Sequence, residues 1–262
     1  MERKMVNRQP RDHRFKEKEN LIYGPHSVVE AIKSGREINK ILIQKGINKD
    51  LFFELKEVLA GKDFQLQFVP SQKLDRMTSS NHQGVIAFVS PVTYADFYAL
   101  VDEKMERKES ITLLFLDRIT DVRNLGAIAR SAACHSVDAI VLPSKGSALV
   151  TADAIKTSAG ALNSLPVCKV DQLKDALFYL QQSDVKLIAC TEKSNKELPF
   201  GDLTGSVAFI FGSEEDGISN DLLRMASERL KIPMTGGVSS LNVSVSVGIV
   251  LYEQNRQKLT AK

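Results

Sequence analysis

Long runs of consecutive apolar residues follow one another from Ile111 onward, and helical stretches separate them. The runs are TLLFLD at 112–117, AIVLP at 139–143, KLIACT at 186–191 and VAFIFG at 207–212. Strands that are apolar on both faces are typical of a mostly parallel sheet with helices on both sides. The stretches 125–135, 152–157 and 171–180 predict helices between these strands. The pattern therefore predicts an α/β fold.

Ligands in such sheets bind beyond the carboxyl ends of the strands. The loops that follow these ends are therefore the places where chemistry is expected. They come after Leu116, Leu142, Phe211 and Ile232.

A smaller α/β unit is predicted at residues 21–90. Apolar runs at 40–43, 66–69 and 85–89 indicate strands, and residues 51–59 place leucine and valine on one helical face. Ser27 and Glu30 have the spacing of a capping box for a helix that ends at Gly35. The charged residues 91–110 are interpreted as a connector with some helical character, and residues 111–262 as the second domain.

Near the C-terminus, residues 242–247 alternate between polar and apolar side chains. Alternation with a period of two predicts a half-buried strand. An isolated strand does not explain the paired Gly236 and Gly237 before it, or the long apolar stretch after it. Periodicity alone therefore leaves the role of this segment open.

The composition of the 262-residue chain is that of a globular protein, with 43% hydrophobic and 26% charged residues. No run of about eighteen apolar residues occurs and the N-terminus is charged, so we expect a cytoplasmic protein without a membrane span. The three cysteines and four histidines show no metal-binding spacing. Reduced thiols and no metal site are therefore expected.

The positive charge of the chain is concentrated in a tail at residues 1–20. This tail has seven basic and four acidic side chains, which leaves 28 of each sign in the remainder of the chain. Such a composition buries too little apolar surface to offset the entropy of ordering, so a disordered tail is predicted. Two interpretations remain open: a solvated terminus without a role, or a basic arm that binds a polyanion.

Polar residues are dense in the loop and helix after the first of these strands, at residues 117–132. Asn124 has the position of a helix cap, which is the common role of a single asparagine there. Arg130 lies among alanine and isoleucine, where a solvated cation is less expected. A phosphate or carboxylate would suit it as a partner.

The loop FGSEEDGIS at 211–219 has glycines with the separation found in phosphate-binding loops. It lacks the lysine of those loops, and its three acids would repel a phosphate, so a nucleoside triphosphate is disfavoured. A cationic or hydroxyl-rich small ligand fits better, although an acidic surface turn remains an alternative. The glycine-rich stretch KIPMTGG at 231–237 suits either an aromatic base or an ordinary strand exit.

Taken together and in this order, these loops resemble the three motifs of the SpoU (TrmH) family of RNA ribose 2′-O-methyltransferases. The first motif is similar across residues 117–132, with Asn124, Gly126 and Arg130 at matching places. The second matches FGSEEDGIS, and the third runs from IPM to SLNVSVS. The family often has proline where this chain has Val122, a position that shapes the loop and does no chemistry. In YGPHSVVEAI and SSNHQGVIAFV, residues 21–90 resemble the L30e-like substrate-binding domain of many members.

The resemblance implies a C-terminal α/β-knot (SPOUT) methyltransferase domain with a trefoil knot, a homodimer, and S-adenosylmethionine bound in a bent shape. It also implies a helix that begins near Leu241, against the strand that alternation predicts. In such a helix Ser240, Ser244 and Gly248, spaced four apart, would form a stripe of small side chains.

The same resemblance implies which residues surround the target ribose and which contact the cofactor. The catalytic set is Asn124, Arg130, Glu214, Ser240 and Asn242. The cofactor set is Phe211, Gly212, Ser213, Glu214, Gly217, Ile232, Met234, Leu241 and Val243, with no metal. The family assigns a base role to the arginine, but a guanidinium stays protonated in proteins. We therefore interpret Arg130 as a clamp on RNA phosphate and an electrostatic stabiliser of the incipient alkoxide.

Many relatives with this two-domain layout act on a guanosine of large-subunit ribosomal RNA, whereas transfer-RNA members commonly lack the front domain. Ribosomal RNA is therefore the expected partner and transfer RNA the alternative, with an unpaired or flipped target nucleotide. Candidate phosphate contacts are Arg118, Arg123 and Arg130, together with the N-terminal unit and the tail.

Two other classes of protein are alternatives to this interpretation, and the sequence disfavours both. A nucleotide-dependent oxidoreductase would need a GxGxxG stretch after the first strand, and none occurs. A non-catalytic RNA-binding descendant has no physical need for all five of the residues implied at the ribose.

Overall fold

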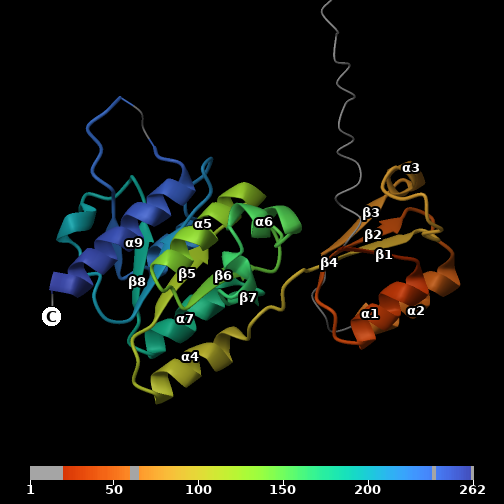
Figure 1. Ribbon diagram of the computed structural model, residues 1–262, viewed down its shortest axis with the longest axis horizontal. Helices are drawn as coiled ribbons and strands as arrows, with labels where there is room; N and C mark the ends of the chain where they lie inside the picture. The colour runs from red at the N-terminus through yellow and green to blue at the C-terminus, as the bar shows by residue number, and fades with distance from the viewer. Residues whose placement is uncertain (1–19, 60–64, 238–239, 261–262) are drawn as a thin grey trace, which may run out of the picture. The chain divides into compact units, whose positions relative to one another are not determined.

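The computed structural model describes residues 20–59, 65–237 and 240–260, which divide into two units (Figure 1). The first unit holds residues 20–59 and 66–89, and the second begins at Ser90. Residues 1–19 lie outside the described residues, so the disordered tail remains a prediction.

A four-stranded sheet with the order β1-β4-β2-β3 forms the centre of the first unit. Its strands are β1 (Leu21–Tyr23), β2 (Ile38–Gln44), β3 (Leu66–Val69) and β4 (Val85–Val89). β4 is antiparallel to both of its neighbours, whereas β2 and β3 are parallel. The helices are α1 (Pro25–Lys33), α2 (Lys49–Leu59) and α3 (Ser71–Asp75). The strands predicted at 66–69 and 85–89 are confirmed, and β2 extends the predicted 40–43 at both ends.

The ends of α1 show one wrong prediction and one correct one. Gly24 is the N-cap and has no side chain to make a cap bond, and Ser27 lies inside the helix instead of preceding it. The predicted capping box is therefore wrong. At the other end Gly35 has φ +76°, and its N–H donates to the carbonyl of Ile32 while Arg36 N–H donates to that of Ala31. This Schellman arrangement needs a left-handed residue, so glycine ends the helix as predicted.

The second unit is built on a six-stranded, fully parallel sheet with the order β10-β8-β9-β5-β6-β7. Its strands are β5 (Thr112–Leu116), β6 (Ala139–Pro143), β7 (Val167–Val170), β8 (Lys186–Cys190), β9 (Val207–Phe211) and β10 (Glu228–Leu230). The helices are α4 (Phe97–Glu106), α5 (Val122–Cys134), α6 (Ala152–Thr157), α7 (Leu173–Gln182), α8 (Asn220–Met225) and α9 (Val243–Thr260). Two 3-10 turns are η3 (Ala161–Asn163) and η4 (Leu198–Phe200). The predicted α/β class with a parallel sheet is confirmed.

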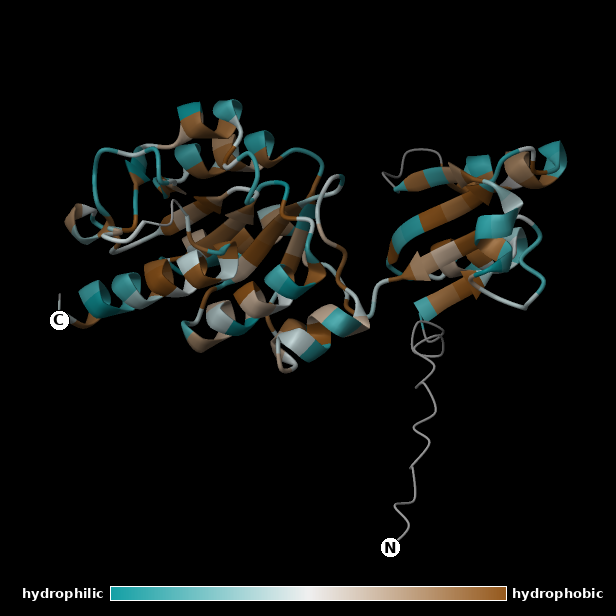
Figure 2. Ribbon diagram, turned by 90° about the horizontal axis from the view of Figure 1, so that it is seen from above, coloured by the Kyte–Doolittle hydropathy of each residue, from teal (hydrophilic) through white to brown (hydrophobic). Residues whose placement is uncertain are grey.

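Both faces of this sheet are buried, as the two-sided apolar runs require. The row Ile188, Phe209, Leu114 and Ile140 crosses four neighbouring strands and belongs to the core that α5 and α9 cover. The next residue of each strand points to the opposite core, which contains Phe97 of α4 and Leu177 of α7. Figure 2 shows the strands in brown between helices that carry hydrophilic residues on their outer sides.

Residues 91–110, expected as a connector, contribute to this second core. α4 begins at Phe97 with Asp96 as its cap, whose side chain accepts from Ala99 N–H at 3.0 Å. Phe97 and Val101 are buried in the core. The segment therefore packs as a helix of the second unit, and the anticipated helical character is confirmed.

The C-terminal segment is helical from Val243 to Thr260. The strand predicted at 242–247 from alternation is wrong, and the helix implied by the resemblance is confirmed with a start two residues later than expected. Burial explains the outcome, because Val243, Val247, Val250, Leu251 and Gln254 lie on one face of α9 and are buried. That spacing of three to four residues is helical, and the packing overrides the strand preference of valine. Ser240 precedes the helix, so the expected stripe of small residues contains only Ser244 and Gly248.

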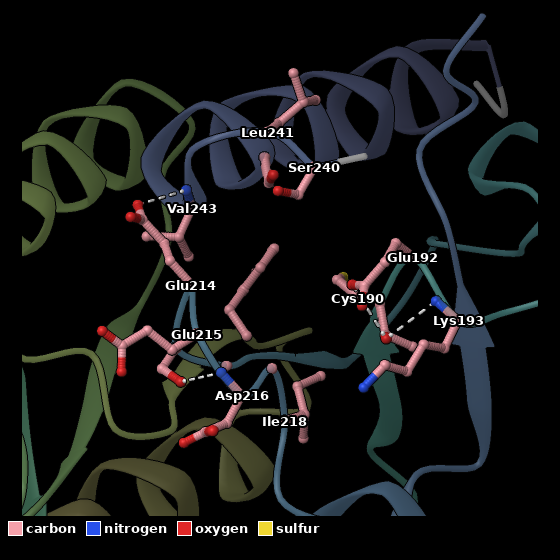
Figure 3. Close-up of a pocket in the computed structure, with 16 residues that line it drawn as sticks. Cys190, Glu192, Lys193, Glu214, Glu215, Asp216, Ile218, Ser240, Leu241 and Val243 are labelled. Carbon is pink, nitrogen blue, oxygen red and sulfur yellow. Dashed lines mark hydrogen bonds between the residues drawn. The ribbon is translucent and has the colours of Figure 1, made fainter. Parts of the chain in front are cut away.

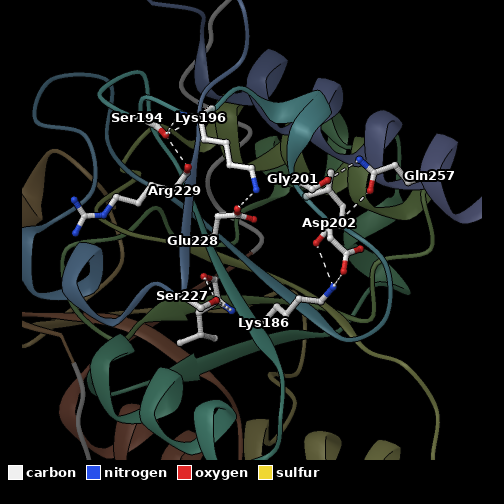
Figure 4. Close-up of polar contacts among 11 residues, drawn as sticks. Lys186, Ser194, Lys196, Gly201, Asp202, Ser227, Glu228, Arg229 and Gln257 are labelled. Carbon is white, nitrogen blue, oxygen red and sulfur yellow. Dashed lines mark hydrogen bonds and ion pairs between the residues drawn. The ribbon is translucent and has the colours of Figure 1, made fainter.

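Polar contacts hold the segment between β8 and β9 against β10 and α9 (Figure 4). Ser194 Oγ donates to the carbonyl of Arg229 at 2.6 Å, and Lys186 Nζ lies 2.6 Å from Asp202 Oδ2. The side chain of Gln257 donates to the carbonyl of Gly201 at 3.0 Å and accepts from Leu203 N–H at 2.9 Å. The C-terminal helix α9 therefore stabilises the segment around Gly201 and Leu203, which lies more than fifty residues before Gln257 in the sequence.

Candidate active site

Three segments that are far apart in the sequence bring their polar side chains together at the start of α9. Asn242 Nδ2 donates to Glu214 Oε1 at 2.7 Å and lies 3.0 Å from Asn124 Oδ1. Asn124 Nδ2 donates to the same Glu214 oxygen at 3.0 Å, and Val243 N–H lies 3.4 Å from it. Glu214 is thus the common acceptor of this cluster, which we call the carboxamide cluster.

Asn124 is free to join the cluster because another residue caps its helix. Asp121 is the N-cap of α5, and its Oδ1 accepts from the N–H groups of Arg123 at 2.6 Å and Asn124 at 3.3 Å. The prediction that Asn124 caps the helix is therefore wrong. Asn124 lies in the first turn, where its side chain reaches the loop after β9. Val122 is the first helical residue, so the departure from proline at this position leaves the helix start intact.

Gly126 is explained by packing between two helices. A Cβ at this position would lie 2.7 Å from the carbonyl oxygen of Ala154 and 2.7 Å from Thr157 Cβ, both on α6. Helix α6 can approach α5 this closely only because the side chain is absent. Gly126 therefore positions α5, and with it Asn124, against the remainder of the unit.

The loop after β9 folds back on itself and needs both of its glycines. A Cβ on Gly212 would lie 2.0 Å from the carbonyl carbon of Gly217, and Gly217 has φ +71°. Gly217 N–H donates to the carbonyl of Ser213 at 2.9 Å, and Asp216 N–H donates to Ser213 Oγ at 3.1 Å. This geometry directs Glu214 and Glu215 outward from the turn.

Arg118 stabilises the loop after β9 through hydrogen bonds of its guanidinium. Its guanidinium donates to Asp216 Oδ2 at 3.0 Å, to the carbonyl of Gly217 at 2.9 Å and to Asp117 Oδ1 at 3.2 Å. Asp117 in turn accepts from Ser219 N–H at 2.7 Å. Arg118 was expected among the RNA contacts, but its hydrogen bonds are committed to the loop. We therefore regard it as a positioning residue.

A hollow of about 320 Å³ lies between the loop after β9, the loop after β8 and the start of α9 (Figure 3). A smaller adjoining hollow of about 80 Å³ shares the loop after β8, Ser240 and Leu241 with it. All nine residues expected to contact the cofactor line one of the two. Phe211, Gly212, Ser213, Glu214, Gly217, Leu241 and Val243 line the larger hollow, and Ile232 and Met234 line the smaller.

The loop after β8 was missed by the sequence analysis. Cys190, Thr191, Glu192 and Lys193 form the wall opposite the loop after β9 (Figure 3). The sequence did contain a signal for this loop. It follows the carboxyl end of the apolar run KLIACT, as ligand-binding loops of parallel sheets do. Burial raises the pKa of the Cys190 thiol, so this sulfur is a neutral, unreactive part of the wall.

The charges around the larger hollow favour a cation. Among the described residues, four carboxylates line it, from Glu192, Glu214, Glu215 and Asp216, whereas Lys193 is the single basic residue of its wall. The backbone of the glycine turn and the side chains of Ile218, Leu241 and Val243 supply the remaining contacts. A small ligand with a positive centre and an apolar ring therefore fits this hollow.

A third hollow of about 440 Å³ lies on the other side of the loop after β9. Asn124, Asp121, Gly146 and the loop residues Ser213–Asp216 line it. Glu214 and Val243 belong to the walls of both this hollow and the first. The carboxamide cluster therefore stands between two spaces, each large enough for a small ligand.

Two of the expected catalytic residues lie apart from this cluster within the chain. Arg130 is on the exposed side of α5, six residues and therefore roughly 9 Å along the helix from Asn124. Its side chain makes no hydrogen bond or ion pair with the residues that the structure describes. Ser240 lines both parts of the hollow without a hydrogen bond to any described residue. The structure thus joins Asn124, Glu214 and Asn242, places Ser240 beside them, and leaves Arg130 outside.

Within the described ranges, no group of three or more histidine, cysteine, aspartate or glutamate side chains has an arrangement that would hold a metal ion. A search of the same ranges finds no helix with the length and apolarity needed to cross a membrane.

A cofactor-sized hollow beside a polar cluster, at the carboxyl edge of a parallel sheet, defines an α/β enzyme that brings a small cofactor to a second substrate. Two family models match the chain: the SpoU rRNA Methylase family at residues 111–252, and the RNA 2′-O ribose methyltransferase substrate binding family at residues 21–95. The chain belongs to the SpoU (TrmH) methylase family, and it is an S-adenosylmethionine-dependent RNA methyltransferase.

Relatives of similar length support this assignment. A Staphylococcus aureus protein assigned to the TrmH family of tRNA/rRNA methyltransferases is 36% identical over 247 residues, which cover 92% of this chain and 97% of that protein. A Staphylococcus saprophyticus protein with the same assignment is 34% identical over 240 residues, with 92% and 96% covered.

Solved structures with the same fold cover nearly the whole chain. The crystal structure of an RNA 2′-O ribose methyltransferase has a TM-score of 0.55 and 26% identity, and covers 95% of this chain and 93% of that chain. The SpoU methyltransferase AviRb from Streptomyces viridochromogenes, in complex with AdoMet, has a TM-score of 0.57 and 21% identity, with 92% and 90% covered.

Proposed function

We propose that the protein transfers a methyl group from S-adenosylmethionine to a ribose 2′-hydroxyl of RNA, and that its target is a guanosine of large-subunit ribosomal RNA in the cytoplasm. The observation that carries the proposal is the position of Asn124, Glu214 and Asn242 between two hollows. In this proposal the acidic hollow lined by Gly212 and Leu241 holds the cofactor, and the hollow beside Asn124 receives the target nucleotide.

The residues of the first hollow suit the cofactor physically. Its sulfonium is a cation, which four carboxylates in the wall favour, and its adenine is an apolar ring, which Ile218, Leu241 and Val243 can contact. When bound, S-adenosylmethionine supplies an electrophilic methyl group. The turn at Gly212 and Gly217 is already closed by its own hydrogen bonds, so little ordering entropy is lost on binding.

The carboxamide cluster would align the ribose. Holding a hydroxyl oxygen in line with the methyl group removes a large part of the entropic barrier to reaction. Glu214 fixes the amide of Asn242 through a 2.7 Å hydrogen bond, and Asn242 Oδ1 also accepts from Ser244 Oγ at 2.6 Å. Hydrogen bonds at both the nitrogen and the oxygen of this amide fix its orientation. In this proposal the fixed amide faces the target nucleotide.

Arg130 would act in the site of a second copy of the chain. Its side chain is exposed on α5, has no partner among the described residues, and lies roughly 9 Å along the helix from Asn124 of its own chain. Exposed apolar side chains on α9, Val245, Tyr252 and Leu259, support a homodimer. In a dimer the cation would bind RNA phosphate and stabilise negative charge on the 2′-oxygen. The trefoil knot implied by the family belongs to the same proposal.

The dimer is tested by mixing two inactive variants. Arg130→Ala and Asn242→Ala should each abolish methyl transfer, and a refolded mixture should regain about a quarter of wild-type activity, because half of random dimers then hold one intact site. Activity that stays absent in the mixture would show that both residues serve the same chain's site.

The role of Arg130 is tested by Arg130→Lys. If the residue is a fixed cation, the lysine variant should show no new titration in its rate near pH 10. A rate that rises with pH in that range would assign it the role of base.

The reaction is tested by mapping ribose methylation across ribosomal and transfer RNA with and without the protein. A single protein-dependent mark on a large-subunit guanosine is expected. A mark confined to transfer RNA would favour the alternative substrate. No mark in either, together with no binding of S-adenosylmethionine by calorimetry, would indicate a non-catalytic RNA-binding descendant.

A further inference from the structure

The sheet of the first unit has one well-covered face and one that is only partly covered. Helices α1 and α2 lie on one side of the sheet, and the five-residue α3 lies on the other (Figure 1). On the α3 side, Leu74 packs against a small core of Leu42, Val69 and Ile86. Leu21, Tyr23, Met77 and Phe88 border this core and remain half-buried.

The register of the strands places two aromatic rings and a lysine on this face. Phe88 of β4 is opposite Leu21 of β1 on one side and Lys40 of β2 on the other. Tyr23 is opposite Ile86, two residues along the same strand from Phe88. Directly opposite residues of antiparallel strands share a face, and diagonal neighbours are about 7–8 Å apart. Tyr23, Phe88 and Lys40 therefore form one continuous surface, which we call the aromatic face.

The aromatic face is positively charged. Lys40 lies on it, and Lys73 and Arg76 extend from α3 and the residue after it. Within the described part of the chain, none of these three side chains makes a hydrogen bond or an ion pair. Desolvation, and then the charge of Lys73, lower the pKa of Lys40 below its ordinary value. Among the described residues, the causes of this shift are burial and Lys73 alone, and the carboxylate of Asp75 on α3 bonds His82 Nε2 at 3.0 Å.

We propose that the aromatic face binds a single-stranded segment of the substrate RNA, with bases stacked on Tyr23 and Phe88 and phosphates beside Lys40 and Lys73. This inference rests on the proposed function, since it concerns how the same substrate is held. Half-buried rings within a sheet present flat, rigid surfaces to which bases stack at little entropic cost. Unpaired cations beside the rings then attract the phosphates.

The chemistry favours a single strand over a duplex. In a duplex the base faces are already stacked and cannot contact an aromatic side chain. The methyl transfer proposed above also needs an unpaired or flipped nucleotide, so an adjoining unpaired segment is a consistent substrate.

The test uses the full-length protein and a fluorescein-labelled, mixed-sequence 12-nucleotide RNA, followed by fluorescence anisotropy. Tyr23→Leu keeps the apolar bulk and removes the ring, so affinity should fall by roughly fivefold to a hundredfold. Tyr23→Trp should keep the affinity. The matched control is Phe53→Leu on α2, which removes a more exposed ring from the other side of the sheet and should change affinity less than about twofold.

The charges are tested by salt dependence. Lys40→Gln should lower the slope of log affinity against log salt by about one, and Lys56→Gln on α2 should leave that slope unchanged. A labelled RNA duplex of the same sequence should bind more weakly than the single strand and should be insensitive to Tyr23→Leu.

Two results with the Tyr23→Leu variant would overturn the proposal. RNA affinity that is unchanged in Tyr23→Leu shows that the ring does not contact RNA, and a change in oligomeric state in that variant shows that a second copy covers the face. In steady-state assays the variant should raise the KM for RNA and keep kcat. If the wild-type protein methylates no RNA, the proposed function fails, while the anisotropy result on the aromatic face stands by itself.

Discussion

The two sheets of the molecule differ in how completely they are covered. In the second unit, helices bury both faces, and the carboxamide cluster lies at the carboxyl ends of the strands. In the first unit, one face carries half-buried rings and unpaired lysines. A site that must align two reactants gains from a rigid, fully packed support. A surface that only holds a substrate can leave part of its sheet open, at a cost in stability. The difference indicates a division between chemistry and binding.

The largest expected effect concerns stability. Phe209 is fully buried in the centre of the six-stranded sheet, so Phe209→Ala should lower the free energy of unfolding by about 3–5 kcal/mol. Phe88→Ala on the aromatic face should lower it by about 1 kcal/mol, because this side chain is only partly buried. Urea unfolding followed by circular dichroism measures both. Equal losses would mean that the two sheets are covered to the same extent.

The next effect tests the rigidity of the cofactor turn. In Gly212→Ala the new Cβ would meet the carbonyl carbon of Gly217 at 2.0 Å, so the turn must open. We expect roughly 100-fold weaker binding of S-adenosylmethionine, or about 2.7 kcal/mol. Gly236→Ala is the matched control, since nothing lies within 4 Å of its added Cβ. Calorimetric titration distinguishes the two, and similar affinities in both variants would contradict the closed turn.

A smaller effect on cofactor binding is expected at Arg118, whose hydrogen bonds stabilise this turn. Arg118→Gln removes the ion pair with Asp216 and the hydrogen bond to the Gly217 carbonyl. Because the guanidinium is partly exposed, we expect about tenfold weaker cofactor binding rather than its loss. Arg123→Gln, in the exposed first turn of α5, should leave cofactor affinity unchanged. If Arg118→Gln instead weakens RNA binding alone, the arginine contacts phosphate, as the sequence first suggested.

The smallest effect is a dependence on pH in the first unit. The pKa of Lys40 is lowered in the folded state, so the protonated lysine destabilises the fold at neutral pH. This cost is relieved as the pH rises through the lowered pKa toward the ordinary value of 10.5, and stability rises across that window. Lys40→Met should therefore gain less than about 1 kcal/mol at pH 7 and lose this rise, while it weakens RNA binding. A stability loss at pH 7 would contradict the assignment.

The sequence predicted most of the strands because their chemistry is local. Continuous apolar runs such as Val207–Phe211 have one simple explanation, which is burial on both faces. The short strands β1, β7 and β10 were not predicted, and β10 shows why. β10 reads Glu-Arg-Leu and carries little apolar signal, so its strand state depends on pairing with β8.

The residues of the carboxamide cluster were predictable from the sequence, but their geometry and the loop after β8 were not. The order of the three motifs identified Asn124, Glu214 and Asn242, but their separation by up to 118 positions gives no indication of which atoms meet. Asp121 and Asn124 are both good helix caps, and only the position of the first turn decides between them. The alternation at 242–247 predicted a strand because local propensity contains no information about the helix α5 that packs against it.

The hydrogen bonds that join Gln257 to Gly201 and Leu203 have a consequence for biosynthesis. Translation delivers residues in order at about 5–20 per second, and Gln257 is made more than fifty residues after the segment that it secures before β9. Asn242 also arrives late, so a nascent chain holds RNA-binding residues well before it holds a complete catalytic cluster. Catalytic competence is therefore acquired only when synthesis of α9 is finished.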